Sequence, residues 1–227
     1  MTMDGWGRMS RAERDAAYNN TAACPGGPAY MEALRAESAA FRAARPDHLD
    51  LAYGPSQREA WDLFPGPSGS DCLVFIHGGY WQRNDREGAA ALVEGALASG
   101  WSAGGHLAAM ALAHPAVTAA MPVSGIFELG PLRDTYLNEK LSLTDDEVAT
   151  LSPLRLPAPD KPMGLAYGTA ELPALIADSR ALHARRAVLH RPGALLPVPH
   201  ADHFTVLDAL RRPGGALLSL ARALLEA

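Results

Sequence analysis

The hydrophobic positions of this chain fall into short apolar runs that alternate with longer segments of helical composition. Residues 72–76 form a continuous apolar run between turn residues, which is typical of a strand covered on both faces. The same pattern predicts strands at 117–123, 162–167 and 187–189, and helices at 85–97, 104–114, 173–185 and 204–227. Strands that alternate with helices predict an α/β fold with a mostly parallel sheet.

The segments outside this alternation have patterns of their own. Residues 1–48 read as a helical arm, in which Ser10 can cap a helix with Glu13 and a Pro-Gly-Gly-Pro cluster precedes a helix over 29–44. An antiparallel strand pair is expected over 49–64, around Gly54-Pro55-Ser56. Residues 131–158 contain an acidic helix over 144–151 and could form a cap. We expect a single domain, 1–227.

Composition narrows the classes of function. The 227 residues are 48% hydrophobic and 20% charged, which suits one globular domain. A net charge of -5 without a basic cluster does not indicate a surface that binds nucleic acid or an anionic membrane. No apolar run reaches the ~18 residues of a membrane span, and the N-terminus lacks the apolar core of a signal peptide, so a cytoplasmic protein is expected. The expected partners are a small-molecule ester or formamide and, at most, a second copy of the chain.

A candidate nucleophile lies in Gly100-Trp101-Ser102-Ala103-Gly104. This G-x-S-x-G pattern is typical of a sharp strand-to-helix turn that exposes a serine, and its glycines avoid collisions. The pattern alone is weak, because it can also mark the start of an ordinary helix. The helical residues that follow would place N–H groups and a helix dipole beside Ser102.

A candidate oxyanion hole follows the apolar run at 72–76. His77-Gly78-Gly79-Tyr80-Trp81 places two glycines where backbone N–H groups can point into a site, and the N–H of Ala103 would complete the set. The alternative is a plain glycine turn after a strand. Both motifs in one chain, in the order found in hydrolases, point to acyl transfer more strongly than either alone.

A serine hydroxyl needs a histidine as base and a carboxylate to orient that histidine. His203 opens the last helical segment from a loop and is the preferred base, with His200 as the alternative. Glu171 follows the strand predicted at 162–167, at the end where functional groups of such sheets gather, and is the preferred acid.

Three other carboxylates fit the role of the acid less well. Asp178 is expected on a helix facing solvent, Asp160 precedes its strand, and Asp202 is expected to cap a loop. A metal site at His200, Asp202 and His203 matches no hydrolytic metal motif. No metal and no cofactor are therefore expected.

The chain resembles the α/β-hydrolase kynurenine formamidases (arylformamidases) and their esterase-like relatives. The resemblance rests on FIHGGYW at 75–81, SAGGHL at 102–107, Tyr167-Gly168 with Glu171-Leu172-Pro173, and His203-Phe204. Tyr18-Asn19-Asn20 and the segment 53–64 also look like the family's N-terminal part. The resemblance implies an α/β-hydrolase fold, a triad of Ser102, Glu171 and His203, and oxyanion contacts from Gly78, Gly79 and Ala103.

The resemblance also implies a reaction, the hydrolysis of an N-formyl aryl amide such as N-formylkynurenine to formate and kynurenine, a step of tryptophan catabolism. Tyr80, Trp81 and Trp101 could form an aromatic wall for this substrate, or they could equally be core residues. Small esters are the alternative substrates, because the same machinery hydrolyses them.

The chain departs from the family pattern before Ser102. A helix over 85–97 would descend ~20 Å, and four residues can climb at most ~14 Å back. Residues 95–100 are small and helix-prone where a nucleophile strand would be β-branched. We therefore expect a shortened fold that lacks one strand–helix unit and the nucleophile strand. Three alternatives follow: an active compact hydrolase, a catalytically silent deletion form, and a non-enzymatic binding module.

Overall fold

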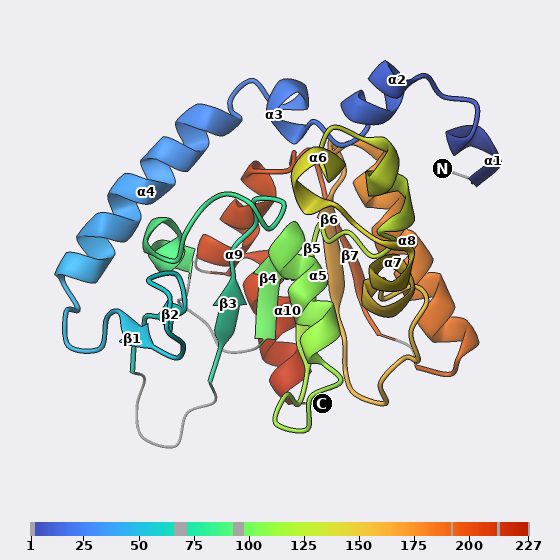
Figure 1. Ribbon diagram of the computed structural model, residues 1–227. Helices are drawn as coiled ribbons and strands as arrows, with labels where there is room; N and C mark the ends of the chain where they lie inside the picture. The colour runs from blue at the N-terminus through green and yellow to red at the C-terminus, as the bar shows by residue number, and fades with distance from the viewer. Residues whose placement is uncertain (1–2, 66–71, 93–97, 192, 213, 227) are drawn as a thin grey trace.

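The structure is a computed structural model that describes residues 3–65, 72–92, 98–191, 193–212 and 214–226 (Figure 1). A five-stranded sheet of order β3-β4-β5-β6-β7 forms its centre, and β1 and β2 form a separate antiparallel pair. The strands are β1 (Leu51–Ala52), β2 (Ala60–Trp61), β3 (Val74–Ile76), β4 (Ala98–Trp101), β5 (Ala120–Val123), β6 (Leu165–Gly168) and β7 (Leu195–Val198). All neighbours in the large sheet are parallel, which confirms the predicted α/β-hydrolase class of architecture.

Helices connect and cover the strands. The α-helices are α1 (Met3–Trp6), α2 (Arg11–Ala16), α3 (Asn20–Ala23), α4 (Gly27–Ala43), α5 (Ala103–Ala111), α6 (Asn138–Leu141), α7 (Asp145–Leu151), α8 (Pro173–Val188), α9 (Asp208–Arg211) and α10 (Ala216–Leu225). Three 3₁₀ helices complete the set: η1 (Glu87–Leu92), η2 (Gly130–Asp134) and η3 (Thr205–Leu207). Within the described residues, no helix combines the length and the apolar character needed to cross a bilayer.

The sheet is buried on both faces. Met121 and Val123 of β5 pack into one apolar cluster with α10, whereas Ala120 of the same strand packs into a second cluster with α5 and α8. Figure 1 shows α5 in front of the sheet and α9 and α10 behind it. This alternation follows from the two-residue period of a strand, and it explains why the central strands read as continuous apolar runs.

The prediction that the nucleophile strand is missing was wrong. Residues Ala98–Trp101 form β4, which pairs with β3 on one side and β5 on the other. Small side chains are required here: a Cβ at Gly100 would lie 2.0 Å from the carbonyl oxygen of Gly104, and Ser99 Oγ donates to Met121 O at 3.1 Å. Pairing on two sides therefore overrides the low strand propensity of this segment.

The helix predicted over 85–97 is also different. Its described part is the six-residue helix η1, and residues 93–97 lie outside the described residues. A 3₁₀ helix rises about 2 Å per residue, so η1 is about 12 Å long. The described residues 77–92, between β3 and β4, contain no strand. The predicted shortening of the fold therefore applies to a strand–helix unit between β3 and β4, and not to β4 itself.

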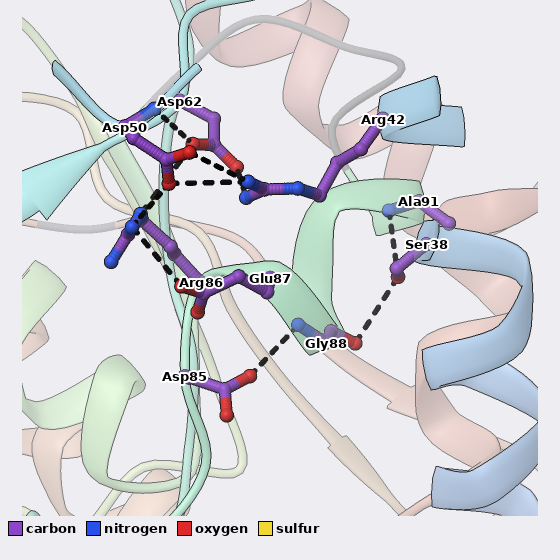
Figure 2. A network of polar contacts seen from close by, with 9 residues as sticks. All are labelled: Ser38, Arg42, Asp50, Asp62, Asp85, Arg86, Glu87, Gly88 and Ala91. Atoms are coloured by element: carbon purple, nitrogen blue, oxygen red, sulfur yellow. Dashed lines mark hydrogen bonds and ion pairs between the residues drawn. The ribbon is translucent and has the colours of Figure 1, made fainter. Parts of the chain in front are cut away.

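A polar network fastens η1 to the N-terminal part of the chain (Figure 2). Arg42 of α4 and Arg86 bind the carboxylates of Asp50 and Asp62, which flank the β1–β2 pair. Ser38, fully buried on α4, donates to Gly88 O and accepts from the N–H of Ala91, both at 3.1 Å. The region before β4 is thus held by side chains from α4 and from the hairpin.

Two other predicted elements differ from the structure. The strand expected at 187–189 is instead the end of α8, and the last strand of the sheet is β7. The helix expected over 204–227 is divided into η3, α9 and α10, with Gly214 at φ +74° between the last two. Arg212, which ends α9, has an extended backbone, as expected of a residue that precedes a proline, and this accounts for the break.

Candidate active site

Ser102 lies at a strained turn between β4 and α5. Its backbone has φ 58° and ψ −121°, a conformation that residues with a side chain rarely adopt. Its N–H donates to Val123 O at 2.9 Å, and a Cβ at Gly104 would lie 1.9 Å from Ile76 O. Tight packing against β3 and β5 therefore holds the turn. This packing requires glycine at the second position before the serine and at the second position after it.

Backbone N–H groups surround Ser102 on the side of β3. A Cβ at Gly78 would lie 2.9 Å from Ser102 Cβ, so the two residues are in contact. Among the residues that the structure describes, the N–H groups of Gly78, Gly79 and Ala103 donate no hydrogen bond. Gly79 has φ +119°, and Ala103 is the first residue of α5. Free donors beside a serine suit an oxyanion that forms during acyl transfer.

Glu171 and His203 form a buried pair on the opposite side. Glu171 Oε2 accepts from His203 Nδ1 at 2.8 Å, and the side chains are 0% and 3% exposed. The other oxygen, Oε1, accepts from the N–H of Gly168 at 2.7 Å and from Ser124 Oγ at 2.5 Å. Three donors thus fix the orientation of the carboxylate, and the carboxylate fixes the imidazole.

The backbone of the histidine is fixed as well. Trp101 Nε1 donates to His203 O at 2.7 Å, and the two rings lie 5.0 Å apart. Because Trp101 precedes Ser102, this contact brings His203 next to the serine turn. Within the described part of the chain, neither Ser102 Oγ nor His203 Nε2 takes part in a hydrogen bond, so the serine and the histidine are not joined directly.

The alternative residues for base and acid lie apart from this pair. His200 is exposed, and Asp160 forms an ion pair with Arg191 on the surface. Asp202 caps the following turn by accepting from the N–H groups of Phe204 and Thr205. In the described part of the chain, no three His, Cys, Asp or Glu residues are grouped so that they could hold a metal ion.

Asp178 was expected to face solvent, and this was wrong. Its Oδ2 accepts from the N–H groups of Phe127 and Glu128, at 2.7 and 3.2 Å, in the segment that follows β5. Burial raises the pKa of Asp178 to about 7, against the lowering effect of these hydrogen bonds. Asp178 is thus a half-buried carboxylate, and its partners are backbone groups and not a histidine.

The three aromatic residues predicted as a substrate wall have structural partners. Trp101 is 4% exposed and belongs to the core on the α10 side of the sheet. Tyr80 is also 4% exposed and hydrogen-bonds to the N-terminal arm. Trp81 is half-buried and lies edge-on to His106, with ring centroids 5.1 Å apart. The structure therefore favours a core role for Trp101 and Tyr80, and a contact with substrate stays a prediction for Trp81.

The sequence pattern did not reveal Ser124 or the role of Trp101 at this site. Ser124 is fully buried directly after β5, has φ +51° and donates to Glu171. Its position at the carboxyl end of a strand was a usable signal, because functional groups gather at that edge. The indole N–H of Trp101, which holds His203, left no signal in the local pattern, because its partner is 102 residues away.

Two curated proteins are similar to this chain in sequence. The kynurenine formamidase of Danio rerio is 26% identical, with 67% of this chain and 73% of that protein covered. The kynurenine formamidase of Salmo salar is 24% identical, with 80% of this chain and 83% of that protein covered. No protein-family model matches the chain.

Solved structures with the same fold are hydrolases by name. The "putative thioesterase" of Silicibacter sp. TM1040 superposes with a TM-score of 0.80 at 25% identity, covering 92% of this chain and 99% of that one. An esterase/lipase from an uncultured bacterium has a TM-score of 0.57 at 16% identity, covering 73% and 80%. The chain is an α/β-hydrolase, an enzyme of hydrolase type that is similar to kynurenine formamidases and esterases.

Proposed function

We propose that the chain is a serine hydrolase that cleaves N-formyl aryl amides, with N-formylkynurenine as the first substrate to test. The observation that carries the proposal is the buried Glu171–His203 hydrogen bond of 2.8 Å beside the strained turn of Ser102. The names of the curated relatives supply the substrate class. Small esters are the second candidate, because esterases share the fold.

The proposed reaction proceeds through a formyl-enzyme. Ser102 Oγ attacks the formyl carbon while His203 Nε2 takes the hydroxyl proton, and Glu171 stabilises the imidazolium that forms. The carbonyl oxygen becomes negative and accepts from the N–H groups of Gly78, Gly79 and Ala103. His203 then returns the proton to the departing arylamine nitrogen as the C–N bond breaks.

Water then hydrolyses the formyl-enzyme, and His203 again acts first as a base and then as an acid. His203 takes a proton from water, the resulting hydroxide attacks the formyl-enzyme, and the proton goes back to Ser102 Oγ as formate leaves. One water is consumed, and one formate and one arylamine are released. Each oxyanion donor is expected to contribute roughly 10²- to 10³-fold to the rate.

Intact-mass spectrometry after treatment with a fluorophosphonate tests the nucleophile. We expect one label per chain in the wild type and none in Ser102→Ala. Ser179→Ala is the matched control: it removes another fully buried serine, on α8, that does not bind Glu171 or His203, and it should keep the label. A label that survives Ser102→Ala would assign the nucleophile elsewhere, and a folded wild type that takes no label would favour a silent or binding protein.

Kinetics then separate the two substrate classes. A kcat/KM for N-formylkynurenine that exceeds the value for p-nitrophenyl acetate supports the formamidase. The reverse ranking supports the esterase. Both activities should disappear in Ser102→Ala, because both reactions use the same nucleophile.

A further inference from the structure

The loop that carries the candidate oxyanion donors is strained over three consecutive residues. Gly79, Tyr80 and Trp81 have φ values of +119°, +51° and +56°. Left-handed conformations are disfavoured for residues with a Cβ, and two in succession after a glycine need support from the surrounding structure. The contacts of this loop therefore decide where its N–H groups point.

Local contacts hold the carbonyl side of the loop. Gly79 O accepts from the N–H groups of Gln82 and Arg83, both at 3.0 Å, and Gly78 O accepts from Asn84 Nδ2 at 3.1 Å. These bonds leave the N–H groups of Gly78 and Gly79 free. They do not involve the side chain of Tyr80, which is the first strained residue after the glycines.

The side chain of Tyr80 is held by the N-terminal arm. Its hydroxyl donates to Tyr18 O at 2.5 Å and accepts from Asn20 Nδ2 at 3.1 Å. Both bonds are buried, and they join residues at least 60 positions apart in the chain. Burial raises the pKa of Tyr80 well above its usual range, so the hydroxyl keeps the proton that it donates.

The arm itself is anchored next to the catalytic histidine. Asn20 is 4% exposed at the start of α3, and the side chain of Asn19 caps this helix by accepting from the N–H of Ala22. The chain then enters α4 at Gly27, where a Cβ would lie 2.4 Å from the ring of Phe204, the neighbour of His203. The arm therefore touches both sides of the candidate site.

We propose that Tyr80 and Asn20 are positioning residues that hold the Gly78–Gly79 loop in the conformation of an oxyanion hole, so that the N-terminal arm is part of the catalytic apparatus. The inference rests on the proposed serine hydrolase. It goes beyond the triad because neither residue reaches the reacting atoms. Loss of the Tyr80 bonds frees the peptide after Gly79 to rotate, which misdirects the donors while leaving Glu171 and His203 in place.

The test compares Tyr80→Phe with Tyr30→Phe. Tyr30 is a matched control on the same arm, because it also loses one hydroxyl, whose bond goes to Asp208 and not to the loop. We expect Tyr80→Phe to lower kcat and the rate of fluorophosphonate labelling about 10- to 100-fold with little change in KM, since displaced donors weaken the transition state more than binding. Tyr30→Phe should keep both rates.

A double-mutant cycle and hydrogen exchange complete the test. If the two residues act as one unit, Asn20→Ala added to Tyr80→Phe will lower kcat much less than it does in the wild type. Exchange at Gln82 and Arg83, whose amides bond to Gly79 O, should be faster in Tyr80→Phe than in Tyr30→Phe. Circular dichroism melts identify any variant that is simply unfolded.

The outcomes separate this inference from the proposed function. Wild-type kcat in Tyr80→Phe, or a loss confined to KM, overturns the inference while the label on Ser102 upholds the hydrolase. If the wild type takes no label, the proposed function fails, and hydrogen exchange alone decides whether Tyr80 holds the loop. Faster exchange in Tyr80→Phe then still supports this inference, and unchanged exchange overturns the inference.

Discussion

The two sides of Ser102 are built in different ways. One side consists of Ser124, Glu171 and His203, each of which follows a strand of the central sheet. Ser124 and His203 both bind the carboxylate of Glu171 directly. The loop with Gly78 and Gly79 depends instead on the arm, which supplies the partners of Tyr80, while α4 and the hairpin fasten the following helix η1. A regular sheet edge positions the proposed acid and base, whereas long-range side-chain contacts hold the loop of the proposed oxyanion donors.

This difference predicts where catalysis and stability separate. Changes on the acid–base side should affect turnover far more than folding, because β5 and β6, the strands before Ser124 and Glu171, are paired on both sides. Changes in the network around η1 should affect folding first, because its ion pairs join the β1–β2 hairpin to α4 and to Arg86.

The largest effect is expected for Glu171→Gln. The amide would donate to His203 Nδ1, which selects the wrong tautomer, and it could not stabilise the imidazolium. The amide oxygen would still accept from Gly168 and Ser124, so the fold should be kept. We expect kcat/KM to fall roughly 10²- to 10⁴-fold, as measured with the better of the two substrates. A variant with more than half of the wild-type rate would move the role of the acid to another carboxylate.

A large loss of stability with little loss of turnover is expected for Arg42→Ala. Asp62 is 4% exposed, and loss of its arginine partner leaves a buried charge poorly compensated. The expected cost is about 3 kcal/mol of unfolding free energy, measured by urea denaturation. Arg133→Ala is the control, because its side chain and that of its partner Asp145 lie at the surface, and the expected cost is below about 1 kcal/mol. Equal losses in the two variants would contradict the special role of the η1 network.

The smallest effect is a change in pH dependence for Asp178→Asn. The pKa of Asp178 is about 7 in the folded chain and near 4 in an unfolded one, so the folded state binds the proton more tightly. Its contribution to stability is therefore full below pH 4 and is lost as the pH rises through 7. Between pH 6 and 8 the unfolding free energy of the wild type should fall by about 1 kcal/mol more than that of the variant.

Urea denaturation at several pH values measures this slope. Asp160→Asn provides the control, because Asp160 lies at the surface in an ion pair with Arg191. Parallel pH curves for wild type and Asp178→Asn would show that this carboxyl titrates normally. Turnover of Asp178→Asn at pH 8 should stay close to wild type, since Asp178 has no contact with His203.

The sequence by itself predicted the class of fold and the residues that meet around the serine turn. These features are local: an apolar run before His77, glycines around Ser102, and an acid and a histidine at the ends of strands. Each is fixed by steric or chemical requirements that act within a few residues, so a pattern can reveal it.

Tertiary structure alone decided the features that depend on distant partners. The segment of β4 is small and helix-prone, yet β3 and β5 pair with it and make it a strand. Asp178 is turned away from solvent because the segment after β5 bonds to it, and Tyr80 is held by Tyr18 and Asn20. Local propensity differs by at most about 1 kcal/mol per residue, so pairing and burial across the chain can reverse what the sequence pattern favours.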